Sequence, residues 1–431
     1  MKDLLRRHFE NLEKQVDVKF KNEYASLVNF STRHSHPVHR WFYYHEAFSP
    51  ELIEKVIENY CGQKKGSVID PFNGGGTTTL VSSLKGIDSV GLEVNPFSYF
   101  LSKVKCQKYK TQEVAIIREN IDHLKTILKN KAKHSIPALS IIDRLFDAPV
   151  LKELLSFKAE IYKVENKRVR DFLMLGWLCI LERVSNYRKG GNGLKKRPRS
   201  ASEKNAKQQL FIQLDLMLVD IECLLQQGAY KHFVEPELKY LNCVDAFPNL
   251  EKKFDLAVFS PPYLNCFDYF EVYKTELWMG DFVESYDQLR QLRRNTLRSH
   301  LNASFKSELS TEKHFVKIIE PLFNYLKEKK LWDKKIPLMV WFYFEDMFRV
   351  LKNLSMVLKP KGACVIVVGN SAYANAVIPV DVLLATLSRE AGFECEAINV
   401  ARRNETSSQQ HKNLGNSSKY LRESLVILRK E

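Results

Sequence analysis

Four consecutive residues, Ser260-Pro261-Pro262-Tyr263, have the side chains and spacing of a small chemical site. The apolar run before them, residues 254–259, has the length of a strand, and it must end here because proline cannot donate to a β-ladder. The prolines stiffen the turn, from which the Ser260 hydroxyl, the Pro261 carbonyl and the Tyr263 ring project. Such a turn suits a flat base with an exocyclic amino group, since the oxygens accept its N–H bonds and the ring stacks on its face. A strand followed by a proline-rich turn without a ligand fits the tetrapeptide equally well.

A glycine-rich turn forms the second candidate site. It reads Asp70-Pro71-Phe72-Asn73-Gly74-Gly75-Gly76-Thr77 and connects a short apolar strand to an apolar helix face. Glycines let the backbone approach a ligand closely, so a side chain at Gly74 or Gly76 should block binding. The next apolar segment ends near Glu93, where an acid can bind the two ribose hydroxyls of a nucleoside. Strand, turn, helix and spaced acid predict a nucleotide-binding α/β unit, with a unit that binds no ligand as the alternative.

Other apolar segments predict the rest of one α/β sheet that positions these motifs. A helix should begin ahead of the glycine turn, with Ser49 as N-cap and Pro50 in its first turn. In the second half of the chain, strands are predicted over residues 239–245, 254–259, 363–370, 393–401 and 421–428, and helices over residues 341–358 and 379–391. The first of these strands ends on Asp245. The long polar connection over residues 402–420 is typical of a functional or mobile loop.

Two stretches interrupt the sheet pattern, and both carry basic residues. Residues 106–235 predict a helical insertion, and residues 264–335 an insertion that alternates aromatic and basic residues. The cations of the first are Arg183, Arg188, Lys189, Lys195, Lys196, Arg197, Arg199, Lys204 and Lys207, and those of the second are Arg290, Arg293, Arg294 and Arg298, followed by His300. Both runs suit contacts with nucleic acid, and a solvated linker is the alternative for the first.

These patterns divide the chain into four regions. Residues 1–45 form an N-terminal helical and aromatic segment. Residues 46–105 and 236–431 form a catalytic domain. Residues 106–235 are the helical insertion, expected to contact DNA, and residues 264–335 are a candidate target-recognition region within the catalytic domain.

Composition and charge restrict the possible partners and compartment. The 431 residues contain 66 Lys and Arg against 51 Asp and Glu, a formal charge of +15 that favours a polyanionic partner such as nucleic acid. The eight cysteines are scattered without a CxxC pair, which predicts free thiols in a reducing cytoplasm. Four histidines at 34, 36, 39 and 45 lack helical pairing or a carboxylate partner, so no metal site is predicted. The charged residues 1–21 and the lack of a long apolar stretch predict no signal peptide and no membrane span.

Taken together, these motifs resemble the amino-group class of S-adenosylmethionine-dependent DNA methyltransferases. The Ser-Pro-Pro-Tyr tetrapeptide is most similar to that of the cytosine-N4 branch, and the resemblance covers about residues 45–105 and 236–431. It implies a Rossmann-like methyltransferase sheet, S-adenosylmethionine as cofactor and double-stranded DNA as substrate. It also implies a role in restriction-modification, with a cognate restriction endonuclease as a candidate partner. No oligomeric state follows from it.

The resemblance assigns roles to individual residues. The cofactor loop comprises Asp70, Pro71, Phe72, Gly74, Gly76 and Thr77, and the segment that closes over the methionine end contains Phe48 and Ser49. The ribose-binding acid is Glu93, and the acid near the adenine amino group is Asp245. The catalytic clamp is Ser260, Pro261, Pro262 and Tyr263. The implied reaction is direct transfer to a flipped base without a covalent intermediate, so Cys266 is expected to be incidental.

Two departures and three alternatives accompany this interpretation. Asn73 stands where family members often have a small or sulfur-containing residue, and the cofactor loop precedes the clamp, an order that many members with this tetrapeptide reverse. Transfer to adenine N6 or to an RNA amino group is an alternative, although those enzymes usually carry Asp or Asn at the position of Ser260. A protein that binds nucleic acid on the same scaffold without activity is the alternative of a different class.

Overall fold

The structure is a computed structural model that describes residues 2–28, 36–45, 47–61, 66–126, 136–191, 193–196, 205–245, 252–403, 414, 418 and 420–431. Its centre is an eight-stranded sheet with the order β1-β11-β12-β8-β7-β2-β3-β6. The strands are β1 (Val18–Phe20), β2 (Ser67–Asp70), β3 (Asp88–Glu93), β6 (Glu237–Tyr240), β7 (Phe254–Phe259), β8 (Leu358–Gly369), β11 (Phe393–Arg403) and β12 (Arg422–Lys430). Only β12 runs antiparallel to its neighbours. The predicted α/β fold class is confirmed.

The strand order brings the predicted motifs to one edge of the sheet. From β2 the chain moves outward to β3 and β6 on one side, and to β7 and β8 on the other. Because β2, β3 and β7 are parallel, Asp70, Glu93 and Ser260 all lie at their carboxyl ends. Ligands of open α/β sheets bind at this edge, where the strand order reverses.

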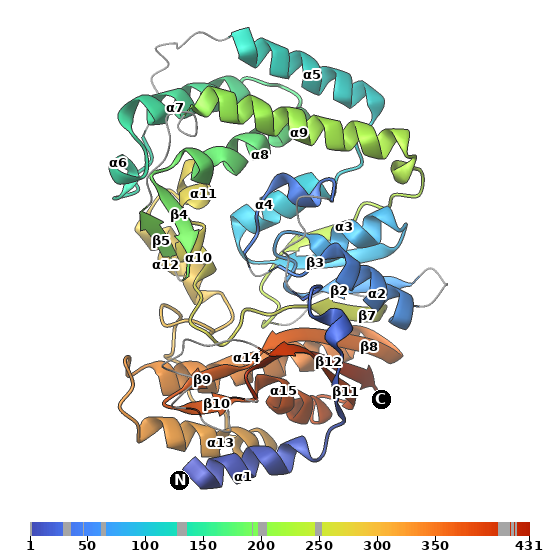
Figure 1. Ribbon diagram of the computed structural model, residues 1–431, viewed down its shortest axis with the longest axis vertical. Helices are drawn as coiled ribbons and strands as arrows, with labels where there is room; N and C mark the ends of the chain where they lie inside the picture. The colour runs from blue at the N-terminus through green and yellow to red at the C-terminus, as the bar shows by residue number, and fades with distance from the viewer. Residues whose placement is uncertain are drawn as a thin grey trace.

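Helices cover both faces because residues on neighbouring positions of each strand point to opposite sides. Val68 and Val258 pack on α2 (Pro50–Tyr60), whereas Ile69 and Phe259 belong to a second core with the helices of the other face. That face, in the lower half of Figure 1, carries α1 (Lys2–Glu13), α13 (Lys313–Lys327), α14 (Ile336–Val357) and α15 (Val380–Arg389). Ser49 caps α2 as predicted, since its side chain accepts a hydrogen bond from the Leu52 N–H.

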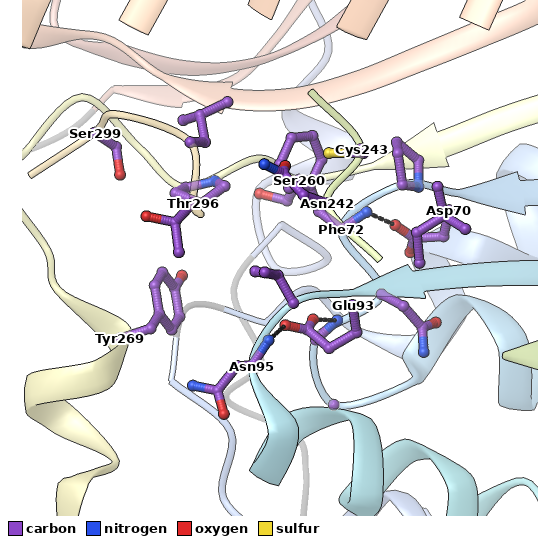
Figure 2. A pocket seen from close by; sticks show the side chains of 18 of the residues that line it. Asp70, Phe72, Glu93, Asn95, Asn242, Cys243, Ser260, Tyr269, Thr296 and Ser299 are labelled. Carbon is purple, nitrogen blue, oxygen red and sulfur yellow. Dashed lines mark hydrogen bonds between the residues drawn. The ribbon is translucent and has the colours of Figure 1, made fainter. Parts of the chain in front are cut away.

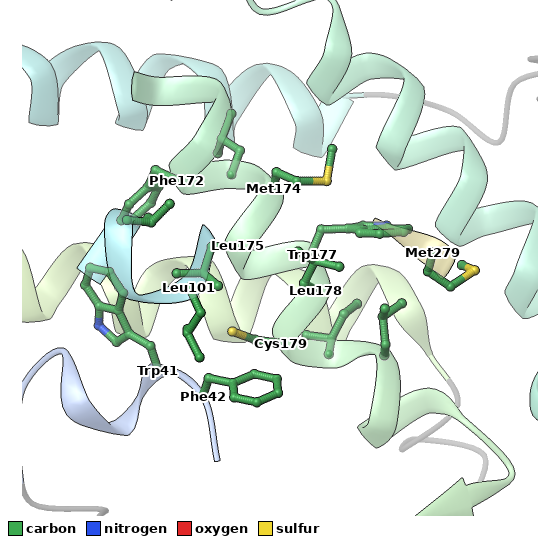
Figure 3. Packing of buried hydrophobic residues seen from close by; sticks show 14 of the residues in the cluster. Trp41, Phe42, Leu101, Phe172, Met174, Leu175, Trp177, Leu178, Cys179 and Met279 are labelled. Atoms are coloured by element: carbon green, nitrogen blue, oxygen red, sulfur yellow. The ribbon is translucent and has the colours of Figure 1, made fainter. Parts of the chain in front are cut away.

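The region over residues 106–235 is built from helices and one hairpin above the sheet (Figure 1). Its elements are α5 (Thr111–Thr126), α6 (Ile142–Leu145), α7 (Ala148–Tyr162), α8 (Lys167–Val184), the β4–β5 hairpin (Tyr187–Gly190 and Gly193–Lys196), α9 (Ala206–Gln226) and the short η4 (Ala229–Lys231). The middle of helix α8, residues 172–181, is apolar and buried, and Figure 3 shows it against Trp41, Phe42 and Leu101. One hydrophobic core therefore joins α8 to α3 (Thr77–Leu84), α4 (Pro96–Lys105) and the N-terminal segment, whose short helices are η1 (Asn22–Tyr24) and η3 (His39–Trp41).

Residues 264–335 are shared between the two halves of the molecule. Helices α10 (Tyr269–Val272) and α11 (Lys274–Met279) and residue Leu289 of α12 (Tyr286–Arg294) belong to the core around α8, whereas α13 belongs to the core with α14 and α15. A small hairpin, β9 (Ser371–Tyr373) and β10 (Ala376–Ile378), follows β8. The four-region division of the chain stays a prediction. No helix among the described residues is long and apolar enough to span a bilayer.

Two predicted details of the sheet were wrong. The strand predicted over residues 239–245 ends at Tyr240, and residues 243–245 form a turn and bend, so Asp245 does not end a strand. Strand β1 was not predicted, because a strand of three residues is too short to show an alternating pattern of apolar and polar side chains. Its pairing with β11, which extends the sheet by one edge strand, comes entirely from contacts distant in the sequence.

Candidate functional site

A pocket opens at the carboxyl ends of β2, β3 and β7, and it gathers most of the residues assigned from the sequence. Of these, Phe48, Asp70, Pro71, Phe72, Gly74, Thr77, Glu93, Ser260 and Pro262 line it. Figure 2 shows Asp70 and Glu93 on one side, with Ser260 between them and a group formed by Tyr269, Thr296 and Ser299. Ser49, Gly76, Asp245, Pro261 and Tyr263 are not part of its wall.

The glycine turn places two of its glycines in left-handed conformations for different reasons. Gly74 has φ +47° and faces the pocket, where an added Cβ would come within 3.1 Å of the Tyr44 ring. Gly76 has φ +78° and is the N-cap of α3, and its Cβ would lie 2.8 Å from the Cβ of Ser102 on α4. A side chain at Gly76 would collide with the helix behind the turn. The expectation that it would also block a ligand stays a prediction.

Two carboxyl groups face the pocket, that of Asp70 buried and that of Glu93 half-buried. The oxygens of Glu93 accept hydrogen bonds from the Gly74 and Asn95 N–H groups, each at 2.7 Å, so the acid ties the glycine turn to the end of β3. Asp70 accepts from the Phe72 N–H at 2.9 Å. Burial raises the pKa of Glu93 to about 7 and that of Asp70 to about 7. Acids with such values favour a ligand that brings positive charge or hydroxyl donors, because these stabilise the ionised form.

The serine of the tetrapeptide is oriented as an acceptor. Its Oγ lies 3.1 Å from the Val367 carbonyl on β8 and donates its only proton there. Because a hydroxyl has one proton and two lone pairs, the lone pairs of Ser260 remain for a donor in the pocket. An exocyclic amine is a donor of this kind.

Tyr263 is held from behind by the C-terminal strands. Its hydroxyl donates to Glu423 of β12 at 2.6 Å, and the same carboxylate accepts from Arg402 of β11 at 2.7 Å. Glu423 is buried. The network fixes the tetrapeptide to two strands that lie more than 130 residues further along the chain, and the stacking role of the ring stays a prediction.

Asp245 and Ser49 do not line the pocket, and each forms hydrogen bonds elsewhere. Asp245 is exposed and accepts a hydrogen bond from the Asn242 side chain, while Asn242 and Cys243 line the pocket in its place. Ser49 is fully buried as the cap of α2, one residue from Phe48. Their contact with a cofactor stays a prediction.

Sequence reasoning missed a group of aromatic and polar residues on the other wall of the pocket. Tyr44 and Tyr269 line it and stack nearly parallel with their ring centroids 6.1 Å apart. Thr296, Ser299 and His300 line it from the segment that follows α12. His300 is buried, burial lowers its pKa, and its Nδ1 has no hydrogen-bond partner among the described residues. No signal in the sequence joins these residues, since Tyr44 and Tyr269 lie more than 200 residues apart along the chain.

Two of the four arginines in the second basic run are held in ion pairs inside the protein. Arg293 pairs with Asp268 and Glu271, each at 2.9 Å. Arg298 donates to Asp346 at 2.9 Å and lies 4.0 Å from the centre of the Phe342 ring. His300 is buried in the wall of the pocket, and the nucleic-acid contact expected of this run stays a prediction. Arg290 and Arg294 are exposed.

The first basic run keeps exposed cations on the β4–β5 hairpin and beside it. Arg183, Arg188, Lys195 and Lys196 are exposed, whereas Lys189 is buried and pairs with Glu276 and Glu182. Lys207 donates to the Lys125 carbonyl, and Arg197, Arg199 and Lys204 lie outside the described residues. Strand β5 contacts α10, which carries Tyr269 into the pocket. Within the described ranges no group of three His, Cys, Asp or Glu side chains could hold a metal ion.

Comparisons with known proteins find sequence similarity to DNA methyltransferases. A family model named for N6 and N4 methyltransferases and described as a DNA methylase matches residues 4–103. The Type II methyltransferase M.AvaI of Nostoc sp. is 28% identical, with 94% of this chain and 89% of that protein covered. M.BsoBI of Geobacillus stearothermophilus is 26% identical, with 94% and 88% covered. Among solved structures, TrmN from Thermus thermophilus shares 9% identity at a TM-score of 0.30, covering 89% of this chain and 49% of that chain.

The sheet with its single antiparallel strand, the glycine turn and the acid after β3 form a Rossmann-like α/β arrangement with a site for a nucleoside-containing ligand. The sequence relatives confirm the resemblance to amino-group DNA methyltransferases. S-adenosylmethionine is the cofactor that this resemblance implies, and the residues of the pocket fit it. Glu93 and Asp70 suit its hydroxyls and its positive charge, Phe48 and Phe72 offer apolar walls, and the glycine turn leaves room for its approach.

Proposed function

We propose that this protein transfers a methyl group from S-adenosylmethionine to the exocyclic N4 amine of cytosine, within a specific sequence of duplex DNA. The observation that carries the proposal is the placement of Ser260. Its hydroxyl is oriented by Val367 as an acceptor, at the edge of the pocket that contains Glu93, Asp70 and the glycine turn. The similarity to Type II methyltransferases supports a role in restriction-modification, with a cognate endonuclease as partner and the cytoplasm as location.

The residues of the chain divide into those that hold the cofactor and those that hold the base. Phe48, Asp70, Pro71, Phe72, Gly74, Thr77 and Glu93 hold S-adenosylmethionine, which supplies an electrophilic methyl group on its sulfonium. Ser49, Gly76 and Asp245 support the cofactor site indirectly. Ser49 caps α2, Gly76 caps α3, and Asp245 accepts a hydrogen bond from Asn242 in the connection after β6.

The tetrapeptide positions the amine. Ser260 Oγ and the Pro261 carbonyl accept hydrogen bonds from its two N–H groups, which turns the nitrogen lone pair towards the cofactor side of the pocket. Pro262 stiffens the turn and Tyr263 stacks on the base, offsetting part of the few kcal/mol that flipping costs. Positioning and electrostatics account for the catalysis, and no residue forms a covalent intermediate.

The β4–β5 hairpin contacts the DNA backbone in this proposal. Its exposed cations, Arg188, Lys195 and Lys196, lie on the strand pair that touches α10, and α10 carries Tyr269 at the pocket wall. Phosphate contacts from this position hold the duplex in register without reading its sequence.

Mass spectrometry of nucleosides from plasmid DNA incubated with protein and cofactor tests the proposal. We expect N4-methylcytosine, and its loss in Ser260→Ala with retained cofactor binding. N6-methyladenine as the only product would replace cytosine by adenine as the target base. Cofactor binding without any modified nucleoside in DNA or RNA would support a nucleic-acid-binding protein without activity.

A further inference from the structure

The loop between α13 and α14, residues 328–335, contains an unusual surface residue. The Trp332 side chain is 71% exposed, the highest value among the large hydrophobic residues described. Two pairs of exposed lysines flank it, Lys329 and Lys330 on one side and Lys334 and Lys335 on the other. A lone exposed apolar residue needs no explanation, but an exposed indole between lysine pairs combines a stacking surface with cations.

The loop is connected to the wall of the pocket. Lys335 Nζ donates to the Leu301 carbonyl at 3.4 Å, and Leu301 directly follows the pocket-lining residue His300. Leu331 and Leu301 also pack against the same hydrophobic core as Cys266, three residues after the tetrapeptide. Trp332 therefore belongs to a loop anchored beside the pocket. This loop joins α13 to α14 in the lower half of Figure 1, and the β4–β5 hairpin lies above these helices.

The neighbouring acid does not cancel the positive charge of the loop. Asp333 is half-buried, and its carboxylate accepts a hydrogen bond from the Lys335 N–H at 2.7 Å, where it stabilises the start of α14. Glu328 is the only other acid in the loop, against four lysines. The loop is thus a cationic element with an aromatic tip, which is the composition that binds phosphates and stacks on bases.

We propose that this loop inserts Trp332 into the DNA duplex beside the target base, while its lysines bind the adjacent phosphates. This inference rests on the proposed function, since it presumes a duplex from which a base is flipped. Flipping leaves an unstacked partner base and an open step in the duplex. Apolar side chains that enter such a step replace the lost stacking and hold the duplex open. Trp332 provides a flat ring of this kind, and its cationic neighbours match the charge of the backbone.

Tryptophan fluorescence gives a direct test. The chain has five tryptophans, and Trp41, Trp177, Trp278 and Trp341 are at most 3% exposed. Quenching by acrylamide should therefore report mainly on Trp332. A duplex oligonucleotide carrying a site that the wild-type protein methylates should quench this emission and shield it from acrylamide. Trp332→Phe should lose the quenching and keep methylation.

Trp332→Ala tests the role of the ring in the reaction. We expect kcat/KM for duplex DNA to fall about 5- to 150-fold with unchanged cofactor affinity, and the loss to shrink when the target lies opposite an abasic site, where flipping is easier. Met356→Ala is the matched control, since Met356 is 57% exposed at the other end of α14.

The remaining outcomes separate a failure of the Trp332 proposal from a failure of the proposed function. If the wild-type protein methylates DNA but neither quenching nor a rate loss in Trp332→Ala is seen, the inference is overturned and the proposed function stands. A Trp332 emission already shielded from acrylamide without DNA would also overturn it, because another surface would then cover the ring. If the wild-type protein modifies no DNA, the proposed function fails first.

Discussion

At the scale of single residues, the ligands that the pocket can bind depend on which hydroxyl and carboxylate oxygens can still accept hydrogen bonds. Ser260 donates to Val367, so it can only accept from a ligand, and Glu93 already accepts from Gly74 and Asn95. The residue types were predictable, because a tetrapeptide and a spaced acid are local patterns. The orientation was not, since Val367 lies 107 residues away from Ser260 along the chain.

Removal of the Ser260 hydroxyl should slow methyl transfer more than it weakens binding. The lost hydrogen bond aligns the amine during transfer, and such a bond contributes about 1–3 kcal/mol, or roughly 5- to 150-fold in kcat. Single-turnover kinetics of Ser260→Ala would measure this. Ser388→Ala is a matched control, because its buried hydroxyl likewise donates to a backbone carbonyl and does not line the pocket. An equal loss in both variants would point to a structural role for Ser260.

Cofactor affinity should rise with pH between about 5 and 7. The pKa values of Glu93 and Asp70 are raised to about 7 by burial, so the free pocket holds protons in this range. A cation with hydroxyl donors binds the ionised form, and binding therefore releases protons. Calorimetry at several pH values should show the increase, by at most about tenfold per pH unit for each acid. A flat profile would contradict it, and Glu93→Gln should flatten the profile and weaken binding.

The same two acids should affect stability in the opposite direction. Because their folded-state pKa values lie above the unfolded reference values near 4, the folded protein binds more protons than the unfolded chain. Their contribution is complete below about pH 4 and is lost as the pH rises towards 7. Bound cofactor should reverse this part of the pH dependence, which thermal melts with and without cofactor can compare.

At the scale of elements, strong local periodicity predicted most helices and strands, and tertiary contacts decided the rest. Helix α8 and strand β8 were recognisable as buried apolar runs, and Ser49 as a cap. The end of β6 at Tyr240 was not, because residues 241–245 are apolar enough for a strand but have no partner strand among the described residues.

At Gly76 the sequence correctly indicated that glycine is needed, but the structure gives a different reason for it. Gly76→Val should lower the free energy of unfolding by about 2–4 kcal/mol, from a left-handed backbone and a collision with Ser102. Chemical denaturation would measure it. Gly193→Ala is the control, since nothing lies within 4 Å of its added Cβ. Adding Ser102→Gly to Gly76→Ala should recover the part of the loss that comes from the collision, and no recovery would contradict the packing explanation.

At the scale of the whole molecule, a formal charge of +15 indicates a polyanionic partner but does not locate the contact. The fold sorts the two basic runs. It pairs Lys189, Arg293 and Arg298 with carboxylates and leaves the hairpin cations exposed. Sequence cannot make this distinction, because the carboxylates that neutralise these cations, such as Glu276 and Asp346, come from distant helices.

The salt dependence of DNA binding should separate the exposed cations from the buried one. Replacing Arg188, Lys195 and Lys196 together by Ala should reduce the slope of log K against log salt by about 3, near one for each lost phosphate contact, with the fold unchanged. Three other exposed lysines serve as the control: Lys14 directly after α1, Lys55 on α2 and Lys361 on β8. Their triple replacement should leave the slope unchanged. Lys189→Met should instead destabilise the protein by about 3–5 kcal/mol, because Glu276 would remain buried without a partner. A wild-type slope in the hairpin variant would show that the hairpin does not bind the backbone.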